Sequence, residues 1–136
     1  MNASTEPSRT DGCTAPTTLI VDGANVVGSR PDGWWRDRAG AARRLFDRLT
    51  DADLPYDRVV LVLEGAAKAG VPAGDGPVVV VHAPREGDDE IVEQARGAAA
   101  DGPVTVATAD RELRERVREV GAEILSPGRL LELLKD

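Results

Sequence analysis

Short runs of β-branched and other apolar residues alternate with amphipathic stretches along most of the chain. The apolar runs are typical of strands buried on both faces of a sheet, and they lie at 18–21, 58–63, 77–82, 104–107 and 123–125. Between them, apolar residues recur every three or four positions, which predicts helices at 35–49, 87–99, 110–120 and 127–134. The stripe of the first helix starts at Trp35, so we expect this side chain to pack in the core.

The order of these segments predicts an α/β fold, a three-layer α/β/α sandwich around a mostly parallel five-stranded sheet. Right-handed crossovers then give the strand order 3-2-1-4-5. Residues 65–76 are rich in glycine and alanine and predict a mobile loop. Residues 1–16 are polar and lack periodicity, which predicts a disordered tail before a single domain at 17–136.

Composition and charge restrict the possible partners and the cellular compartment of the protein. A net charge of −7 counts against tight nucleic-acid binding, although local arginines can still steer a phosphate backbone. Cys13 is the only cysteine, so no disulfide can form within the chain, which fits a reducing, cytoplasmic compartment. No apolar run approaches the ~18 residues of a membrane span, and no signal peptide is visible, so we expect no membrane partner.

Acidic residues follow the apolar runs at regular places. Asp22 ends the first run, Glu64 ends the second, and Asp88 with Asp89 opens the helix after the third. Asp110 follows the fourth run. Because parallel strands share one carboxyl edge, these side chains should gather there, and like charges packed together usually need a cation. The pattern therefore favours a metal-dependent phosphodiester enzyme.

Each acid also has a purely structural interpretation. Asp22 can serve only to hydrogen-bond its turn, where Gly23 lets the backbone bend sharply. Asp110 can be only the N-cap of its helix, and one of Asp88 and Asp89 is expected to cap the helix that they open while the other faces the crevice. A single acid at a strand end is usually solvated, so the argument depends on the whole set.

Other side chains add less. His82 is the only histidine and is interpreted as a rim residue, and no Ser/His/Asp set, P-loop or pair of cysteines is present. Arg36 and Arg111 can contact phosphate, or lie on a solvated face. Trp34 can pack or stack on a base, and the sequence leaves this open.

Together these motifs resemble the opening and closing motifs of the NYN domain, a branch of the PIN-like nuclease superfamily, and within it the YacP-like group. The resemblance runs from about residue 17 to 134. It is carried by LIVDGANV at 19–26, LEG at 63–65, DDEI at 88–91 and TADREL at 108–113. The first and last segments are fairly specific as a pair.

The resemblance implies a Rossmann-like sheet, a site for Mg²⁺ or Mn²⁺, and endonucleolytic hydrolysis of RNA phosphodiester bonds. It implies that Asp22, Asp110 and Asp88 or Asp89 are the metal-site acids, with Asn25 supporting them. Two positions depart from the family pattern. Glu64 stands where relatives often have Asp, and Ala109 replaces a Ser, which removes a hydroxyl near the site.

The mechanism that these residues suggest is a metal-assisted attack of water on the phosphate. The acids named above hold the ion, with Glu64 as a further candidate ligand, and Arg111, Lys68 or Arg36 binds the phosphate charge. The loop at 65–76 would close over the strand. Two alternatives stay open: a non-catalytic RNA- or ribosome-binding module of the same fold, and a small nucleotide phosphohydrolase.

Overall fold

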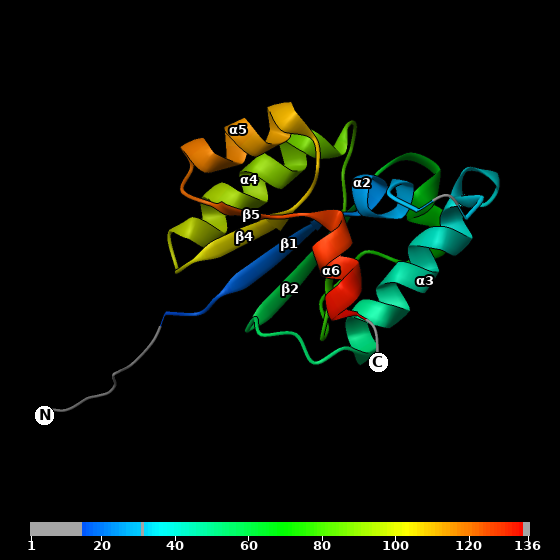
Figure 1. Cartoon of the computed structure of the whole chain (residues 1–136), viewed down its shortest axis with the longest axis horizontal. Coiled ribbons are helices and arrows are strands. Elements are labelled where there is room, and N and C mark those ends of the chain that lie inside the picture. The colour runs from blue at the N-terminus through cyan, green and yellow to red at the C-terminus, as the bar shows by residue number, and fades with distance from the viewer. Residues whose placement is uncertain (1–14, 31, 135–136) are drawn as a thin grey trace, which may run out of the picture.

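A parallel sheet forms the centre of the molecule. The computed structural model describes residues 15–30 and 32–134, and the sheet in this part has five strands in the order β3-β2-β1-β4-β5. The strands are β1 (Thr18–Asp22), β2 (Arg58–Leu63), β3 (Val79–His82), β4 (Val104–Ala107) and β5 (Glu123–Leu125), and every pair of neighbours is parallel. The predicted strand order is confirmed, and β1 lies at the centre (Figure 1).

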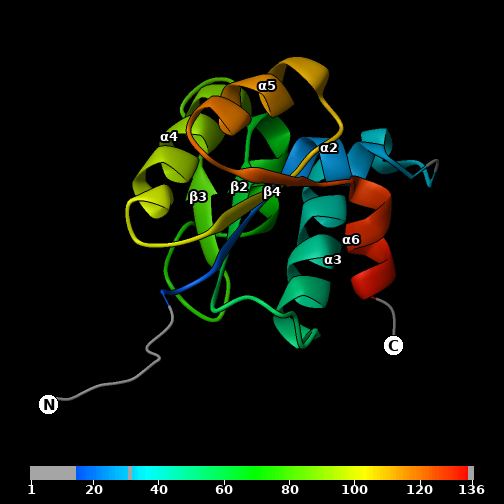
Figure 2. The ribbon, with the colours of Figure 1, turned by 60° about the vertical axis from the view of Figure 1, so that its left-hand side comes forward.

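Helices cover both faces of this sheet. The described α-helices are α2 (Gly23–Gly28), α3 (Arg38–Asp51), α4 (Gly87–Ala99), α5 (Arg111–Glu119) and α6 (Pro127–Leu133), with 3₁₀ helices η1 (Trp34–Arg36) and η2 (Gly65–Gly70). Figure 2 shows α4 and α5 on one side of the strands and α3 and α6 on the other. The predicted three-layer α/β/α sandwich is therefore confirmed.

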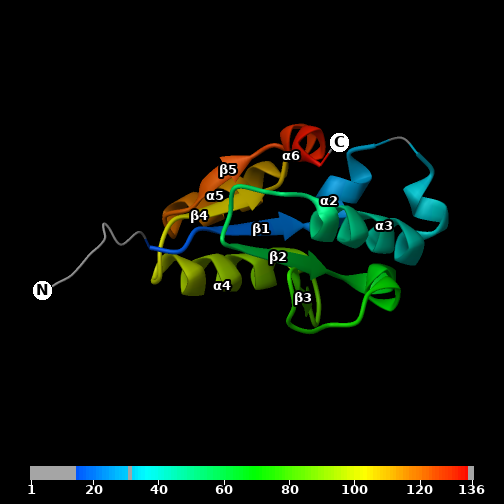
Figure 3. The same ribbon diagram turned by 90° about the horizontal axis from the view of Figure 1, so that it is seen from below.

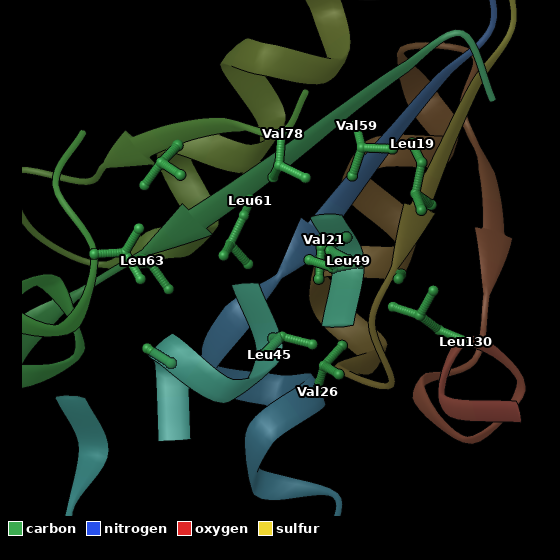
Figure 4. Close-up of a cluster of buried hydrophobic side chains, with 14 of the residues drawn as sticks. Leu19, Val21, Val26, Leu45, Leu49, Val59, Leu61, Leu63, Val78 and Leu130 are labelled. Carbon is green, nitrogen blue, oxygen red and sulfur yellow. The ribbon is translucent and has the colours of Figure 1, made fainter. Parts of the chain in front are cut away.

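The core is split by the sheet into two clusters, as the period of two along a strand requires. Leu19 and Val21 of β1 pack on the α3 side together with Leu61 and Leu63 of β2 (Figure 4). Ile20 lies in the opposite cluster, with the apolar residues of α4 and α5. Because both faces are covered, the central strands are apolar at almost every position, which is why the sequence pattern identified them.

The carboxyl ends of the strands all point to one edge. Figure 3 shows β1 and β2 running side by side toward the end of the sheet where α2 follows β1. Asp22 is level with Val62 in the neighbouring strand, so the residues after β1 and β2 emerge next to each other. This edge brings the predicted acids into one region.

Several predicted details differ from the structure. The short helix α2 was not predicted, and residues 65–70 of the predicted mobile loop form η2. The first long helix begins at Arg38 rather than Trp35, because the side chain of Asp37 caps it by accepting a hydrogen bond from the backbone N–H of Gly40. Trp35 consequently lies in the 3₁₀ turn before it and is 52% exposed, so the prediction that it packs in the core is wrong.

No helix in residues 15–30 and 32–134 is long and apolar enough to cross a membrane. Of the predicted tail, residues 1–14, which include Cys13, lie outside the described residues.

Candidate active site

Asp22 lies at the centre of the carboxyl edge, at the end of the middle strand. Its side chain follows Ile20 on the α4 side of the sheet, and the residue is only 5% exposed. One carboxylate oxygen, Oδ2, accepts a hydrogen bond of 2.9 Å from the Thr108 hydroxyl, and Oδ1 accepts one of 3.3 Å from the backbone N–H of Asn25. The second bond caps α2, so the turn interpretation of Asp22 holds, while the carboxylate still faces the acidic edge.

Thr108 is a site residue that the sequence analysis missed. It is fully buried at the end of β4, and its Oγ1 donates to Asp22 and accepts a 3.1 Å hydrogen bond from the backbone N–H of Asp110. The hydroxyl thus joins the first and last acidic motifs directly. The signal for it was a hydroxyl residue directly after an apolar strand and two positions before an acid.

Asn25 ties the same two motifs together by a second route. Its side-chain oxygen accepts a hydrogen bond of 2.8 Å from the backbone N–H of Ala109. This bond engages the amide oxygen of Asn25, the residue that the resemblance implies supports the metal-site acids. Asn25 therefore positions the segment between β4 and α5 against α2.

Asp110 caps α5, as the structural interpretation predicted. Its Oδ1 accepts a 3.0 Å hydrogen bond from the backbone N–H of Leu113. The same carboxylate lies close enough to Asp88 to raise the pKa of that group, so Asp110 both caps the helix and belongs to the acidic edge. Arg111 is exposed on the first turn of α5, next to this cap.

Glu64 fixes the start of α4. Its Oε1 accepts a 3.0 Å hydrogen bond from the backbone N–H of Gly87, and a Cβ at Gly87 would lie only 2.7 Å from that oxygen. The residue at 87 must therefore be small for Glu64 to reach the helix. Glu64 reaches this backbone N–H because its side chain is one methylene longer than that of Asp. An Asp at this position would lie farther from Gly87.

Asp88 and Asp89 point in different directions. The N-cap of α4 is Glu86, which makes no side-chain capping bond, so the expectation that one of the two aspartates caps this helix is wrong. Asp89 accepts a 2.9 Å hydrogen bond from Arg116 of α5, and its side chain is 76% exposed. Asp88 is half-buried and lies among the acids of the edge.

The charges of the edge influence one another. Burial, together with the negative charges of Asp88 and Glu64, raises the pKa of Asp22 to about 6, although the hydrogen bonds from Thr108 and Asn25 act to lower it. Burial also raises the pKa of Asp88, as do the charges of Asp110 and Glu64, whereas Arg116 lowers it. Asp88 is thus the group that links the other three carboxylates.

The oxygen donors of this edge fit a hard divalent cation. Within residues 15–30 and 32–134, no three His, Cys, Asp or Glu side chains are placed to hold a metal ion directly. Mg²⁺, however, keeps several of its waters and commonly binds proteins through one or two carboxylates together with substrate phosphate. A buried carboxylate whose pKa is raised by its neighbours is the setting in which such an ion relieves repulsion.

The remaining predicted residues lie around the edge rather than in it. Lys68 is half-buried in η2, which directly follows Glu64, and Arg36 is exposed in η1 beside Trp35. His82 is half-buried, and its Nε2 forms a 2.7 Å hydrogen bond with the carbonyl of Val71. That bond agrees with the interpretation of His82 as a rim residue.

The strand order and the parallel crossovers define a three-layer α/β/α fold that is shared with solved YacP structures. The fold is similar to the crystal structure of Rae1 (YacP) from Bacillus subtilis, with a TM-score of 0.69 and 21% identity over 86% of this chain and 72% of that one. A single-substitution mutant of the same protein gives a TM-score of 0.68 and 20% identity, over 87% and 74% of the two chains. No protein-family model and no curated protein sequence matches the chain.

Proposed function

We propose that the chain is a metal-dependent ribonuclease that hydrolyses RNA phosphodiester bonds at the acidic edge. The observation that carries this proposal is the convergence on Asp22: a carboxylate at the end of the central strand, 5% exposed, with a pKa raised to about 6 by burial and then by Asp88 and Glu64. Perturbed acids gathered in this way are typical of functional sites. The YacP-type fold supports the proposal.

Asp22 and Asp88 are the residues that would hold Mg²⁺ or Mn²⁺, with Glu64 and Asp110 completing the charge around it. The ion, when bound, would supply positive charge that acidifies a water molecule and neutralises phosphate. Thr108 and Asn25 hold Asp22 and the Asp110 turn in a fixed relation, so the acids need little rearrangement. Asp89 is engaged with Arg116, which makes it the weaker of the two adjacent candidates.

The substrate phosphate needs cations at the border of this edge. Arg111 stands on the first turn of α5, directly after Asp110, where a helix N-terminus also favours negative charge. Lys68 and Arg36 lie in the two 3₁₀ turns on the α3 side. We propose that these three side chains orient the RNA backbone and stabilise the charge that develops on the phosphate.

The decisive test is cleavage of a labelled RNA with Mg²⁺ or Mn²⁺, with EDTA as the blank. Asp22→Asn and Asp88→Asn should each lower the rate at least about 100-fold, because each removes charge from the proposed ion site. Asp53→Asn, in the exposed loop before β2, makes the same change of charge far from the carboxyl edge and should cleave like the wild type. Wild-type rates for Asp22→Asn would reject the assigned site.

Two further measurements define the reaction. Asp89→Asn should keep most of the activity, because Asp89 is paired outside the cluster. Nucleoside triphosphates offered under the same conditions should stay intact. Their hydrolysis in place of RNA would identify a nucleotide phosphohydrolase.

One observation favours a second candidate, a non-catalytic RNA-binding module of the same fold. The described residues do not place three ligating side chains around one point. A module of this kind would bind RNA but no divalent ion. Calorimetric titration with Mn²⁺ separates the two, because the ribonuclease should show binding that Asp22→Asn weakens.

A further inference from the structure

Among the residues that the structure describes, Trp35 is the large hydrophobic side chain that is exposed. At 52% exposure, no other large apolar residue in 15–30 and 32–134 is comparably open to solvent. The chain has only two Trp, one Tyr and one Phe, so a tryptophan placed on the surface is a notable use of a scarce residue. Exposed tryptophan is typical of sites that stack on a ligand.

A second tryptophan and two arginines hold Trp35 in a defined setting. The Trp34 ring stands at 88° to the Trp35 ring, with 6.1 Å between the centroids. The Arg36 guanidinium lies 5.8 Å from the centroid of Trp35, and the Arg38 guanidinium lies 5.3 Å from that of Trp34. The four side chains form an aromatic platform with one guanidinium group over each tryptophan ring, which we call the tryptophan platform.

The platform opens onto the acidic edge. Trp34 and Arg38 line a cavity of about 130 Å³ whose other walls include Gly23 and Glu64. Gly23 directly follows Asp22, and Glu64 is one of the acids of the edge. The cavity is far smaller than the ~300–1,000 Å³ of sites for drug-sized ligands, so it has room for one small planar group.

Trp34 is the fixed wall of this cavity. It is half-buried, and its ring carbons lie 3.5–4.0 Å from the place where a side chain at Gly28 would begin. Trp34 therefore packs within van der Waals distance of the end of α2. Trp35, on the outside of the same turn, stays free to meet a ligand.

We propose that the tryptophan platform binds the bases of a single-stranded RNA, with one base stacked on Trp35 and a neighbouring base in the Trp34 cavity. This proposal rests on the proposed function, and it names the strand conformation that the site accepts. Stacking of bases on aromatic side chains, with cation–π contributions from arginine, is the usual way of binding single strands without reading their sequence. A base in a duplex is already stacked and cannot make these contacts.

The position of the platform explains how an acidic protein can present RNA to its acidic edge. With a net charge of −7, the chain as a whole repels a phosphate backbone. Stacking energy does not depend on net charge, and Arg36 and Arg38 supply positive charge only beside the platform. The bases would thus anchor the strand while its phosphates extend toward Glu64 and Asp22.

The test uses the intrinsic fluorescence of the full chain in EDTA, where no cleavage occurs. Both tryptophans belong to the platform, so quenching by a short unstructured oligoribonucleotide reports on this surface alone. Trp35→Ala should weaken binding about 5- to 150-fold, as measured by anisotropy of the labelled oligonucleotide. Trp35→Phe should fall between the wild type and Trp35→Ala.

The contribution of the Arg36 charge to RNA binding can be tested with a matched control. Arg36→Gln should weaken binding, whereas Arg118→Gln, an equal change of charge in the last turn of α5, should leave it unchanged. A duplex of the same sequence should quench little. Equal affinity of Trp35→Ala and the wild type, or equal quenching by the duplex, would overturn the proposal.

Failure of this inference is distinct from failure of the proposed function. Metal-dependent cleavage with the same KM in Trp35→Ala and the wild type would reject the platform and leave the ribonuclease intact. Binding that depends on Trp35, without cleavage in Mg²⁺ or Mn²⁺, would keep the platform and reject the ribonuclease.

Discussion

At the scale of single residues, the buried carboxyl group of Asp22 makes the stability of the fold depend on pH. Its pKa is about 6 in the folded chain, against 3.8 for an ordinary aspartate. The native state therefore binds the proton more tightly, and stability falls as the pH rises through this interval. The shift corresponds to about 3 kcal/mol of stability from proton binding. This stability is fully present below pH ~3.8 and fully lost only above pH ~6.

Asp22→Asn should remove this loss. In buffer with EDTA, the free energy of unfolding of the variant minus that of the wild type should increase by about 2.4 kcal/mol between pH 4 and pH 7, because part of the titration of the unfolded chain lies below pH 4. The variant also weakens one hydrogen bond, from Thr108 or Asn25, which lowers its free energy of unfolding by about 1 kcal/mol. This cost is the same at every pH, so it does not alter the change between pH 4 and pH 7. Urea unfolding followed by circular dichroism measures the difference, and a value independent of pH would show that Asp22 titrates normally.

The sequence located the acids of the edge but not the contacts that arrange them. Asp22 and Asp110 could be identified because each follows an apolar run, and such ends meet in a parallel sheet. Thr108 was missed because its hydroxyl joins residues 86 positions apart, which no local pattern encodes. The partner of Asp89 likewise lies 27 positions away, on α5, so spacing alone could not separate Asp89 from Asp88.

At the scale of elements, long buried strands were predictable and short helices were not. The ranges of β2, β4 and β5 agree with the apolar runs, because strands covered on both faces have no polar positions to obscure them. The six residues of α2 include two glycines and an asparagine, so their intrinsic helix propensity is poor and packing must hold them. Trp35 was misplaced because the helical period was extended through a 3₁₀ turn.

Gly23 shows how closely α2 approaches the sheet. We expected this glycine to allow a sharp turn, but it is not among the glycines with positive φ. A Cβ on Gly23 would instead lie 2.7 Å from the carbonyl oxygen of Val62 and 2.9 Å from a methyl group of Leu63. The glycine is needed because the backbone of α2 touches β2, and this contact places Asn25 opposite Ala109.

Gly23→Ala should therefore lower the free energy of unfolding by about 1–3 kcal/mol, because the backbone of β2 must move to admit the methyl group. Gly97→Ala is the matched control, since nothing lies within 4 Å of a Cβ there and the residue is inside α4. The control should be more stable than the wild type by about 0.5–1 kcal/mol. Thermal and urea unfolding of both variants compare them, and a neutral Gly23→Ala would show that β2 yields without cost.

At the scale of the whole molecule, the distribution of charge matters more than its sum. The net charge of −7 includes the acids of the edge, whereas several arginines gather elsewhere. A cleft of about 390 Å³ between α2, α3 and α6 is lined by Arg30, Arg44 and Arg48 and contains none of the acids of the edge. RNA that follows only the tryptophan platform and the acidic edge would not reach this cleft.

The salt dependence of RNA binding tests which of these surfaces is used. Four cations are proposed to meet the strand, namely Arg36, Arg38, Lys68 and Arg111, and each single-strand phosphate contact contributes about −0.7 to the slope of log K against log salt. The slope should therefore be no steeper than about −3, because stacking on Trp35 supplies affinity that salt does not screen. Anisotropy titrations of the labelled oligonucleotide in EDTA at several salt concentrations measure it. A slope steeper than this value that becomes shallower by about 0.7 in Arg44→Gln would mean that the strand also runs along the arginine-lined cleft, where electrostatic contacts add to those of the platform.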